Sequence, residues 1–440
     1  MVESKSPRRR FLFVWWEGGG NMPPALELVR QLVARGHAVH ALCDACSEAA
    51  FLAAGASFAA YRRAPSRLDL SPEADTMKDW EAHNPAQTIA ILRERLMCGP
   101  ALAYAQDTLD QIERFHPDAL VVMDATFGAM IAGQSAGVPT AAVAPHILVY
   151  PVPGRPTFGP GLLPARNMLQ RLRDRVLLSV VNRWMNKGLP QLNAARKAIG
   201  LAPAPTVFET LRADRLLVLT TPALELPGGP LPDNVRYTGP ILVDPDWAQP
   251  WTSPWREDDE RPLVLVGFSS TFQDQTAALR TTIAALGRLP VRALVTTGPG
   301  LRGVSFAAPA NVVVCESAPH NAVLPTVSVM VTHAGHGSVI RALAHDVPLI
   351  CLPMGRDQND IAARVVYHGA GLRLSPKATD RAIETAVRRV LSEPRFKESA
   401  ARLGAAVRRA AGPDAALAEL EALASRRSAV ASPKNARTAA

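Results

Sequence analysis

Cysteine is scarce in this sequence, which has five cysteines among 440 residues. An odd number without regular spacing excludes the disulfide framework of a small secreted domain. Cys43 and Cys46 have the C-x-x-C spacing of redox and zinc sites, but no second Cys/His pair follows at a suitable spacing. We therefore interpret both as packing residues. We interpret no Asp-x-Asp pair of the chain as a metal site, and we predict no metal.

Aromatic residues are also few, at 5 %, and positive charge is not clustered. The net charge of +9 would suit a nucleic-acid partner. However, the basic residues are scattered apart from Arg8–Arg10, Arg426–Arg427 and the tail, and no basic recognition helix stands out. We therefore predict that the chain does not bind nucleic acid.

The apolar run Phe11–Trp16 is too short to span a membrane, and acid and glycines follow it instead of a cleavage site. We expect a cytoplasmic protein without integral membrane association. Hydrophobic residues at 48 % and charged residues at 20 % are typical of globular proteins. A length of 440 residues favours two domains.

Short apolar runs alternate with helical patterns along the first half. Predicted strands cover Phe11–Trp16, Ala38–Cys43, Ser57–Tyr61, Ala119–Asp124, Thr140–Ala144 and, as the last strand of the first domain, Arg215–Thr220. Helices are predicted over Ala25–Val33 and, without a break, over Ala86–Phe115. Arg166–Ile199 predicts one or two amphipathic helices with arginine outside and Leu, Val and Met inside. This alternation predicts an α/β fold with a doubly wound parallel sheet.

Two long loops interrupt the first domain. Residues 62–85 contain three prolines, and Met77 and Trp80 could form an apolar lid over a ligand there. Residues 147–164 are rich in proline and glycine. We place the first domain at residues 1–220 and an interdomain linker, crowded with Pro, Gly and Trp, at 221–261. A second domain follows at 262–385, with helices at 386–425 and a disordered basic tail at 426–440.

The most informative stretch lies in the second domain. The apolar run that ends at Thr332 is followed by His333-Ala334-Gly335-His336-Gly337-Ser338 and then by helix formers. This order predicts a strand, a tight turn and a helix, whose free N–H groups and positive dipole end suit a phosphate. Gly335 and Gly337 permit close approach of a ligand to the backbone. His333, at the tip of the strand, can add a side-chain donor.

A second strand–helix unit follows directly. Val347–Pro353 predicts a strand, and Asp357 and Gln358 stand at its exit. Their side chains offer the acceptors and donors that a ligand rich in hydroxyl groups requires. The carboxyl ends of neighbouring strands are where open α/β sheets bind ligands. We interpret the two units together as a site for a sugar nucleotide.

The pattern His333-x-Gly335-x-x-Ser338, Val347-Pro348, Pro353, Asp357-Gln358 and Gly369-x-Gly371 resembles the donor-binding signature of family 1 glycosyltransferases. The resemblance is strong from Ser328 to Leu374 and thin before Leu263. It implies the GT-B fold, with two doubly wound, Rossmann-like domains facing a cleft and a last helix that crosses back to the first domain. It also implies that His333 and Ser338 contact the donor diphosphate and that Asp357 and Gln358 hold sugar hydroxyls.

Further donor contacts follow from the same resemblance. Ser269, Ser270 and Thr271 match the loop that contacts the donor phosphate, and Ser317, Pro319 and His320 match the loop on the nucleotide base. Many family members that use uridine-diphosphate sugars carry a glutamate where this chain has Arg341, which favours deoxythymidine-diphosphate sugars. Arg356 could contact a sugar or a phosphate, but its sequence context favours a solvated surface arginine. No cofactor is expected beyond the sugar nucleotide, a co-substrate.

The catalytic base is where the sequence departs from the family. Asp124 matches the aspartate that orients the family's histidine base, but Asn21 stands at the position of that histidine, and an amide accepts no proton. Asn21 is a good candidate to cap the following helix. Asp124 itself, or a carboxylate such as Glu17, is then the expected base, with His146 in reserve. Trp16, Trp80 and His146 are the expected acceptor contacts.

The predicted function is an inverting, metal-independent transfer of a sugar to an apolar small molecule of bacterial secondary metabolism. Instead of using a different base, the chain could use an acidic acceptor, or a nitrogen or carbon nucleophile, that needs only positioning. Two other functions stay open: a non-catalytic partner that activates a glycosyltransferase, and a sugar-nucleotide epimerase. The sequence leaves open the sugar, the choice between a uridine- and a deoxythymidine-diphosphate donor, the atom that forms the glycosidic bond, the acceptor and the oligomeric state.

Overall fold

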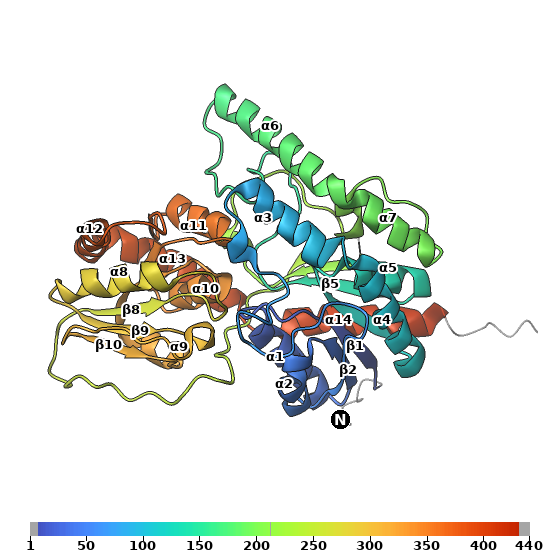
Figure 1. The fold of residues 1–440 in the computed structure, drawn as a ribbon, viewed down its shortest axis with the longest axis horizontal. Helices are drawn as coiled ribbons and strands as arrows, with labels where there is room; N and C mark the ends of the chain where they lie inside the picture. The colour runs from blue at the N-terminus through green and yellow to red at the C-terminus, as the bar shows by residue number, and fades with distance from the viewer. Residues whose placement is uncertain (1–7, 212, 431–440) are drawn as a thin grey trace, which may run out of the picture.

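The structure, a computed structural model, describes residues 8–211 and 213–430. Two lobes lie side by side, each built on one parallel sheet (Figure 1). The first sheet has seven strands in the order β3-β2-β1-β4-β5-β6-β7, and the second has six in the order β10-β9-β8-β11-β12-β13. In each sheet the chain builds outward in one direction from its first strand in sequence, β1 or β8, and then returns to build outward in the other direction. This is the doubly wound topology that the sequence predicts.

The first sheet comprises β1 (Arg10–Val14), β2 (Ala38–Cys43), β3 (Ser57–Ala60), β4 (Ala119–Met123), β5 (Thr140–Ala144), β6 (Arg215–Val218) and β7 (Val235–Tyr237). The second comprises β8 (Leu263–Gly267), β9 (Arg292–Thr296), β10 (Val312–Cys315), β11 (Val327–Thr332), β12 (Leu349–Cys351) and β13 (Gly371–Arg373). The central strands are short apolar runs because helices cover both faces of each sheet. Every residue of β4, β5 and β8 is buried.

The helices of the first lobe are α1 (Met22–Ala34), α2 (Glu48–Ala53), α3 (Pro85–Leu92), α4 (Ala101–Phe115), α5 (Phe127–Ala136), α6 (Met168–Met185) and α7 (Leu189–Ala198). Those that follow are α8 (Thr276–Gly287), α9 (His320–Val323), α10 (His336–Ala344), α11 (Gln358–Tyr367), α12 (Asp380–Ser392), α13 (Pro394–Ala410) and α14 (Asp414–Val430). The prediction of one helix over Ala86–Phe115 is wrong. A π-helical turn at Arg93–Met97 separates α3 from α4, because Gly99-Pro100 cannot continue the hydrogen-bond ladder.

The sequence led us to expect that Arg215–Thr220 is the last strand of the first domain, and this prediction is wrong. β7 adds a seventh strand beside β6, within the segment that we assigned to the linker. Its three residues are too short a run to stand out among the prolines and glycines around them. The first sheet therefore extends past residue 220.

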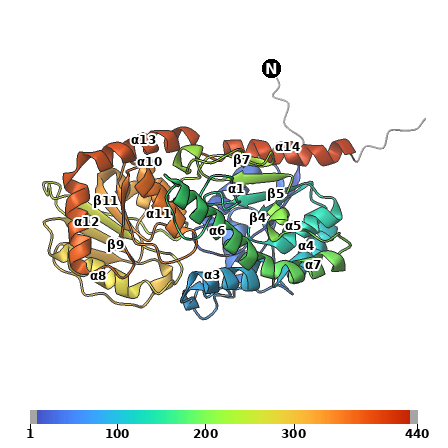
Figure 2. The ribbon, with the colours of Figure 1, turned by 90° about the horizontal axis from the view of Figure 1, so that it is seen from above.

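The last helix crosses from the second lobe to the first. α13 packs on α10, whereas α14 packs on α1 and β4 (Figure 2). Its buried Leu417 and Leu420 belong to the core of the first lobe. α14 continues to Val430, so residues 426–430 are helical where we expected a disordered tail to begin. Residues 431–440 lie outside the described part.

α6 contradicts the predicted burial of its apolar residues. Met168, Leu169, Leu172 and Val176 are between 52 and 79 % exposed, and Met185 is the buried residue of the helix. The amphipathic pattern predicts the helix correctly, but it does not say whether a neighbour covers the apolar face. In the described part of the chain, no helix is long and apolar enough to cross a membrane.

Candidate active site

The two sheets bring the predicted site residues to their carboxyl edges. In the first sheet, the reversal of strand order lies between β1 and β4, and Glu17–Asn21 and Asp124 follow these two strands. In the second sheet, it lies between β8 and β11, which are followed by Ser269–Thr271 and by His333. A ligand is expected at such a crevice.

The turn from β11 into α10 has the predicted form. Gly335 is the residue before the helix, and a Cβ atom there would lie 2.4 Å from His333 Nε2, so the imidazole sits directly over the helix start. Ala334 adopts a left-handed conformation, with φ of 68°. A Cβ atom on Gly337 in the first turn would lie 3.8 Å from the Arg341 guanidinium, an ordinary contact, and the half-buried Ser338 follows it. The first-turn N–H groups and His333 can therefore meet one anion.

His333 is buried and hydrogen-bonded to the backbone of Gly267 on the neighbouring strand. Burial lowers the pKa of its imidazole to about 4. The side chain is therefore neutral at pH 7 unless an anion binds beside it, because a nearby negative charge raises an imidazole pKa. His336, in contrast, has a packing role: its Nε2 lies 3.0 Å from the Thr220 hydroxyl of the first lobe.

The other predicted donor loops lie beside this turn. The hydroxyl groups of Ser269 and Thr271 lie 3.1 Å apart, and Ser270 is more exposed than either. His320 Nε2 lies 3.2 Å from the Thr296 hydroxyl, and its Nδ1 is buried without a hydrogen-bond partner. Pro319 precedes α9, and Ser317 accepts a hydrogen bond from the backbone of Gln249 in the linker.

Asp357 and Gln358 differ in how free their side chains are. Asp357 is half-buried, and burial raises the pKa of its carboxyl group. The Gln358 carbonyl oxygen accepts the backbone N–H groups of Met354 and Gly355, and its amide donates to Gln273 at 2.8 Å. Gln358 therefore holds the loop together in this structure, and a sugar hydroxyl would compete for its amide.

Arg356 is not the solvated surface residue that its sequence context suggests. Its guanidinium makes two hydrogen bonds to Asp79, at 2.8 and 3.0 Å, and a third to the Gly18 carbonyl oxygen at 3.2 Å. Asp79, 6 % exposed, also accepts from Gln273. The Arg356–Asp79 ion pair therefore ties the loop at residues 62–85 to the second lobe. Sequence reasoning missed it, because the partners are 277 positions apart.

We predict that Arg356→Ala opens this contact. The variant leaves Asp79 largely buried without its cation, so we expect a loss of about 2 kcal/mol in unfolding free energy. The apparent KM for the sugar donor should rise about tenfold, because the arrangement in which residues 62–85 contact the second lobe becomes less populated. Thermal unfolding and steady-state kinetics measure the two effects.

The matched control is Arg256→Ala, which breaks an ion pair with Asp258 whose side chains are 85 and 68 % exposed. It should change stability by less than about 0.5 kcal/mol. The double variant Asp79→Ala/Arg356→Ala should lose less than the sum of the two single variants, since it leaves no unpaired charge. Strict additivity of the two changes would contradict the ion pair.

Asn21 does not cap α1, and this prediction is wrong. Its side-chain oxygen accepts the backbone N–H of Gly18 at 3.0 Å, and its amide donates to the Trp16 carbonyl oxygen at 2.8 Å. Both ends of the amide thus brace the turn after β1. A side chain engaged in this way cannot be a catalytic base, so Asn21 positions the turn.

Asp124 and His146 form a pair at the ends of β4 and β5. His146 Nε2 lies 3.4 Å from Asp124 Oδ1, and Nδ1 donates to the Ile147 carbonyl oxygen at 2.8 Å. Burial opposes the charged imidazolium, but the carboxylates of Asp124 and Asp357 raise its pKa to about 9. An imidazole whose pKa is raised in this way is a poorer proton acceptor at pH 7, which favours Asp124 over His146 as the base. The role of His146 stays a prediction.

The Glu17 carboxylate accepts hydrogen bonds at the turn after β1. Its Oε1 accepts the backbone N–H of Gly19 at 2.7 Å, and its Oε2 accepts the Ser47 hydroxyl at 3.3 Å. Burial, with a further contribution from Asp44, raises its pKa to about 7. Both oxygens are engaged, which leaves Asp124 as the carboxylate that fits the role of base.

The raised pKa of Glu17 predicts a pH-dependent stability. Folding disfavours the charged form of Glu17, so the protonated form contributes to the free energy of unfolding at low pH. This contribution is lost as pH rises from the unfolded pKa near 4.5 through the folded pKa of about 7. Glu17→Gln should therefore be more stable than the wild type at pH 8, by an amount on the order of 2 kcal/mol. Denaturant unfolding at pH 8 and at pH 4.5 checks this, and the difference should vanish at the lower pH. A constant difference would refute the assignment to Glu17.

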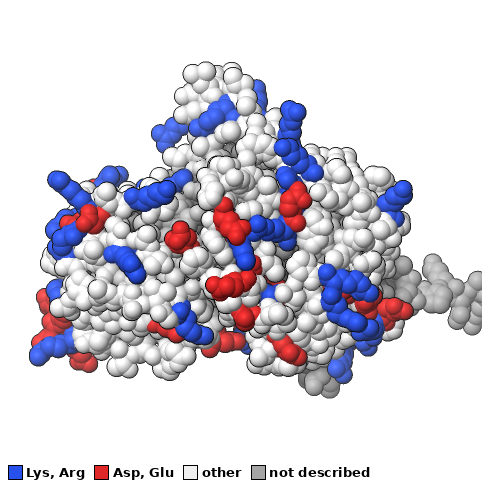
Figure 3. Space-filling model, viewed as in Figure 1, with Lys and Arg blue, Asp and Glu red and all other residues white. Residues whose placement is uncertain are grey.

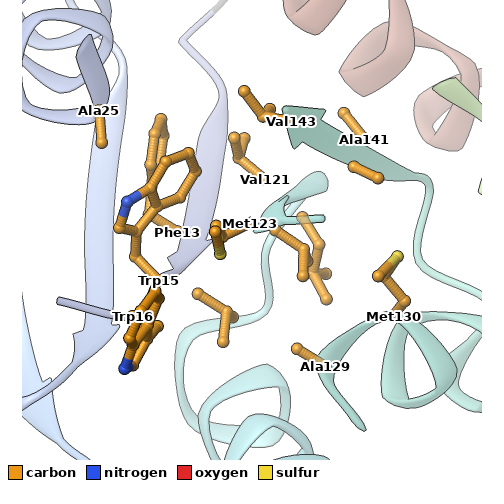
Figure 4. Close-up of a cluster of buried hydrophobic side chains, with 14 of the residues drawn as sticks. Phe13, Trp15, Trp16, Ala25, Val121, Met123, Ala129, Met130, Ala141 and Val143 are labelled. Atoms are coloured by element: carbon orange, nitrogen blue, oxygen red, sulfur yellow. The ribbon is translucent and has the colours of Figure 1, made fainter. Parts of the chain in front are cut away.

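The predicted acceptor contacts are partly buried in the core. Trp16 is 7 % exposed and lies beside Trp15 and Met123 (Figure 4). Trp80 meets Phe272 edge to face across the lobes, with 5.1 Å between the ring centroids. Met77 is buried, so the loop carries one half-exposed aromatic residue to the cleft instead of an apolar lid. Acceptor binding by Trp16, Trp80 and His146 stays a prediction.

Arg341, at the position where many relatives have a ribose-binding glutamate, is held by the linker. Its guanidinium donates to Asp244 at 3.0 Å and to the Gly337 carbonyl oxygen at 2.9 Å. Among the residues that the structure describes, no three His, Cys, Asp or Glu side chains are placed to hold a metal ion.

Comparison with known proteins agrees with this geometry. The family model described as "UDP-glucoronosyl and UDP-glucosyl transferase" matches residues 167–409, more than half of the chain. The chain belongs to this family. This glycosyltransferase is also 33 % identical to 4'-demethylrebeccamycin synthase of Lentzea aerocolonigenes, over 90 % of this chain and 94 % of that protein. Demethyllactenocin mycarosyltransferase of Streptomyces fradiae is 25 % identical, over 92 % of this chain and 84 % of that protein.

Solved structures of glycosyltransferases share the fold. The glycosyltransferase of kitacinnamycin superposes with a TM-score of 0.72 at 21 % identity, covering 95 % of this chain and all of that one. The calicheamicin glycosyltransferase CalG4 gives 0.70 at 20 % identity, covering 97 and 100 %. The GT-B fold expected from the sequence is thus confirmed. The roles of individual site residues stay predictions.

Proposed function

We propose that this enzyme transfers a sugar, with inversion and without a metal, from a nucleoside diphosphate to an apolar natural-product acceptor in the cytoplasm. Two relatives are named 4'-demethylrebeccamycin synthase and demethyllactenocin mycarosyltransferase. These names support a natural product as the acceptor. The single observation that carries the reaction type is the His333 imidazole lying over the amide-lined start of α10.

The donor half handles the leaving group. As the bond from the anomeric carbon to the diphosphate breaks, negative charge builds on the phosphate oxygens. The first-turn N–H groups of α10 and the His333 side chain are fixed in advance at this place, so they can stabilise the charge without reorganising. An anion beside His333 also favours its protonated form, which strengthens the contact.

The acceptor half supplies the base. The attacking atom of the acceptor loses its proton as it bonds to the anomeric carbon, and the Asp124 carboxylate takes that proton. His146, whose Nε2 lies 3.4 Å from Asp124 Oδ1, can orient the carboxylate. The arrangement reverses the family's usual one, in which an aspartate orients a histidine base. A carboxylate is a weaker base than an imidazole, which favours acceptors with an acidic O–H or N–H group.

Arg341 favours a deoxythymidine-diphosphate donor over a uridine-diphosphate donor. A glutamate at this position could accept hydrogen bonds from ribose hydroxyls, whereas a guanidinium is a donor only. Here the guanidinium is already paired with Asp244.

The test is a thermal-shift screen of deoxythymidine- and uridine-diphosphate sugars with the purified protein, followed by transfer to aromatic acceptors. Nuclear magnetic resonance of the product gives the configuration at the anomeric carbon. We expect inversion, a larger shift with deoxythymidine nucleotides and transfer without a second protein. Retention of configuration would overturn the mechanism.

A further inference from the structure

One row of apolar side chains on α6 is uncovered. Met168, Leu172 and Val176 are four positions apart and thus lie in line along the helix, with Leu169 beside them. They are 75, 55, 52 and 79 % exposed, respectively. Isolated exposed leucines are common, but a continuous row on one helix marks a surface that binds something.

A row of arginines runs beside this apolar row. Arg171, Arg175 and Arg183 are all exposed and recur at four- or eight-residue spacing on the neighbouring line of the helix. The acidic residue of α6, Asp174, is half-buried and paired with Arg173. The exposed face of α6 is therefore apolar along one line and positively charged along the next.

The helix also stands out from the body of the molecule. α6 forms the upper edge in Figure 1, and its amino-terminal half reaches beyond the helices beneath it. In the same view, Figure 3 shows uncharged atoms at the top of this protrusion with Lys and Arg on its flanks. A protruding helix can meet a flat surface without obstruction from either lobe.

We propose that α6 docks this enzyme on an anionic lipid bilayer, with the apolar row in the headgroup region and the arginines on lipid phosphates. An interfacial helix has this composition, with leucine-rich and arginine-rich faces side by side. A flat anionic surface engages both rows at once, and the net charge of +9 adds long-range attraction. An integral span is not required.

The position of α6 in the chain links membrane docking to the predicted acceptor side of the site. The segment from His146 runs through the loop at residues 147–164 directly into α6. The same loop reaches the second lobe, where the Gly159 N–H donates to Asp360 at 2.7 Å. A helix seated on a bilayer would thus hold the acceptor side of the cleft close to the phase in which apolar acceptors dissolve.

The test is cosedimentation of the full chain with vesicles of phosphatidylcholine alone or mixed with phosphatidylglycerol. We expect binding to the mixed vesicles that weakens with salt. Arg171→Gln/Arg175→Gln should reduce the partition constant about 30-fold. Leu169→Glu/Leu172→Glu should reduce it by at least about tenfold. All four residues are exposed, so thermal unfolding should stay unchanged.

Two control variants carry the same kinds of change elsewhere, with two arginines replaced in one and a single leucine in the other. Arg381→Gln/Arg388→Gln removes two exposed arginines from α12, and Leu52→Glu charges an exposed leucine of α2. Both should bind vesicles like the wild type. Equal losses in the α6 variants and the controls, or no binding of the wild type at low salt, would overturn the proposal. So would a dimer in light scattering that Leu169→Glu/Leu172→Glu dissociates without any lipid binding, since α6 would then join two copies of the chain.

Discussion

Asp124→Asn is expected to lower kcat about a thousandfold, the usual contribution of a general base. The amide keeps the size of the side chain but cannot take the proton of the acceptor. The KM of the sugar donor should change little, because we place the donor site in the other lobe. Steady-state kinetics with the purified protein and a phenolic acceptor measure both quantities.

The matched control for this variant is Asp258→Asn, an exposed aspartate far from the cleft that should keep wild-type kinetics. Asp124 is 3 % exposed and beside His146, so circular dichroism and thermal unfolding must show that the variant is folded. Turnover within a factor of about two of wild type would remove Asp124 as the base. With an acceptor that carries a more acidic proton, kcat should fall less in Asp124→Asn, because removal of that proton depends less on a general base.

His333→Ala is expected to lower kcat/KM by about 100- to 1,000-fold, the cost of removing one fixed donor from a developing negative charge. It should also weaken binding of the free nucleoside diphosphate, since that contact exists before the reaction. Calorimetric titration of the diphosphate and kinetics with its sugar separate the two effects.

Gly335→Ala provides an independent route to the same result. The added Cβ atom would lie 2.4 Å from His333 Nε2 and must displace the imidazole from the helix start. We expect kcat/KM and diphosphate binding to fall, as they should in His333→Ala. The double variant His333→Ala/Gly335→Ala should lose little more than the more affected single variant. His345→Ala, at the far end of α10, is the control that should bind diphosphate normally. Normal diphosphate binding in His333→Ala would contradict the site.

The sequence alone determined the two doubly wound domains and the local form of the proposed donor site. In the turn from β11 to α10, the strand, the small residues and the helix are contiguous, so local propensities define the turn and place His333 beside the start of the helix. Asp124 could be singled out in the same way, as a carboxylate at the end of a buried strand. The family resemblance was strongest in the turn from β11 to α10 and thin around Asp124.

The tertiary structure decided the remaining parts. Asn21 was a helix cap by sequence, yet its amide braces the turn after β1. Arg356 was a surface residue by sequence, yet it pairs with Asp79 across the lobes. Asp124 can raise the pKa of His146 only because the neighbouring strands β4 and β5 end side by side and bring the two residues together. Local patterns determine which elements form. Partners far apart in the chain meet only when those elements pack, so no local pattern shows which charges pair or whether a helix face such as that of α6 is covered.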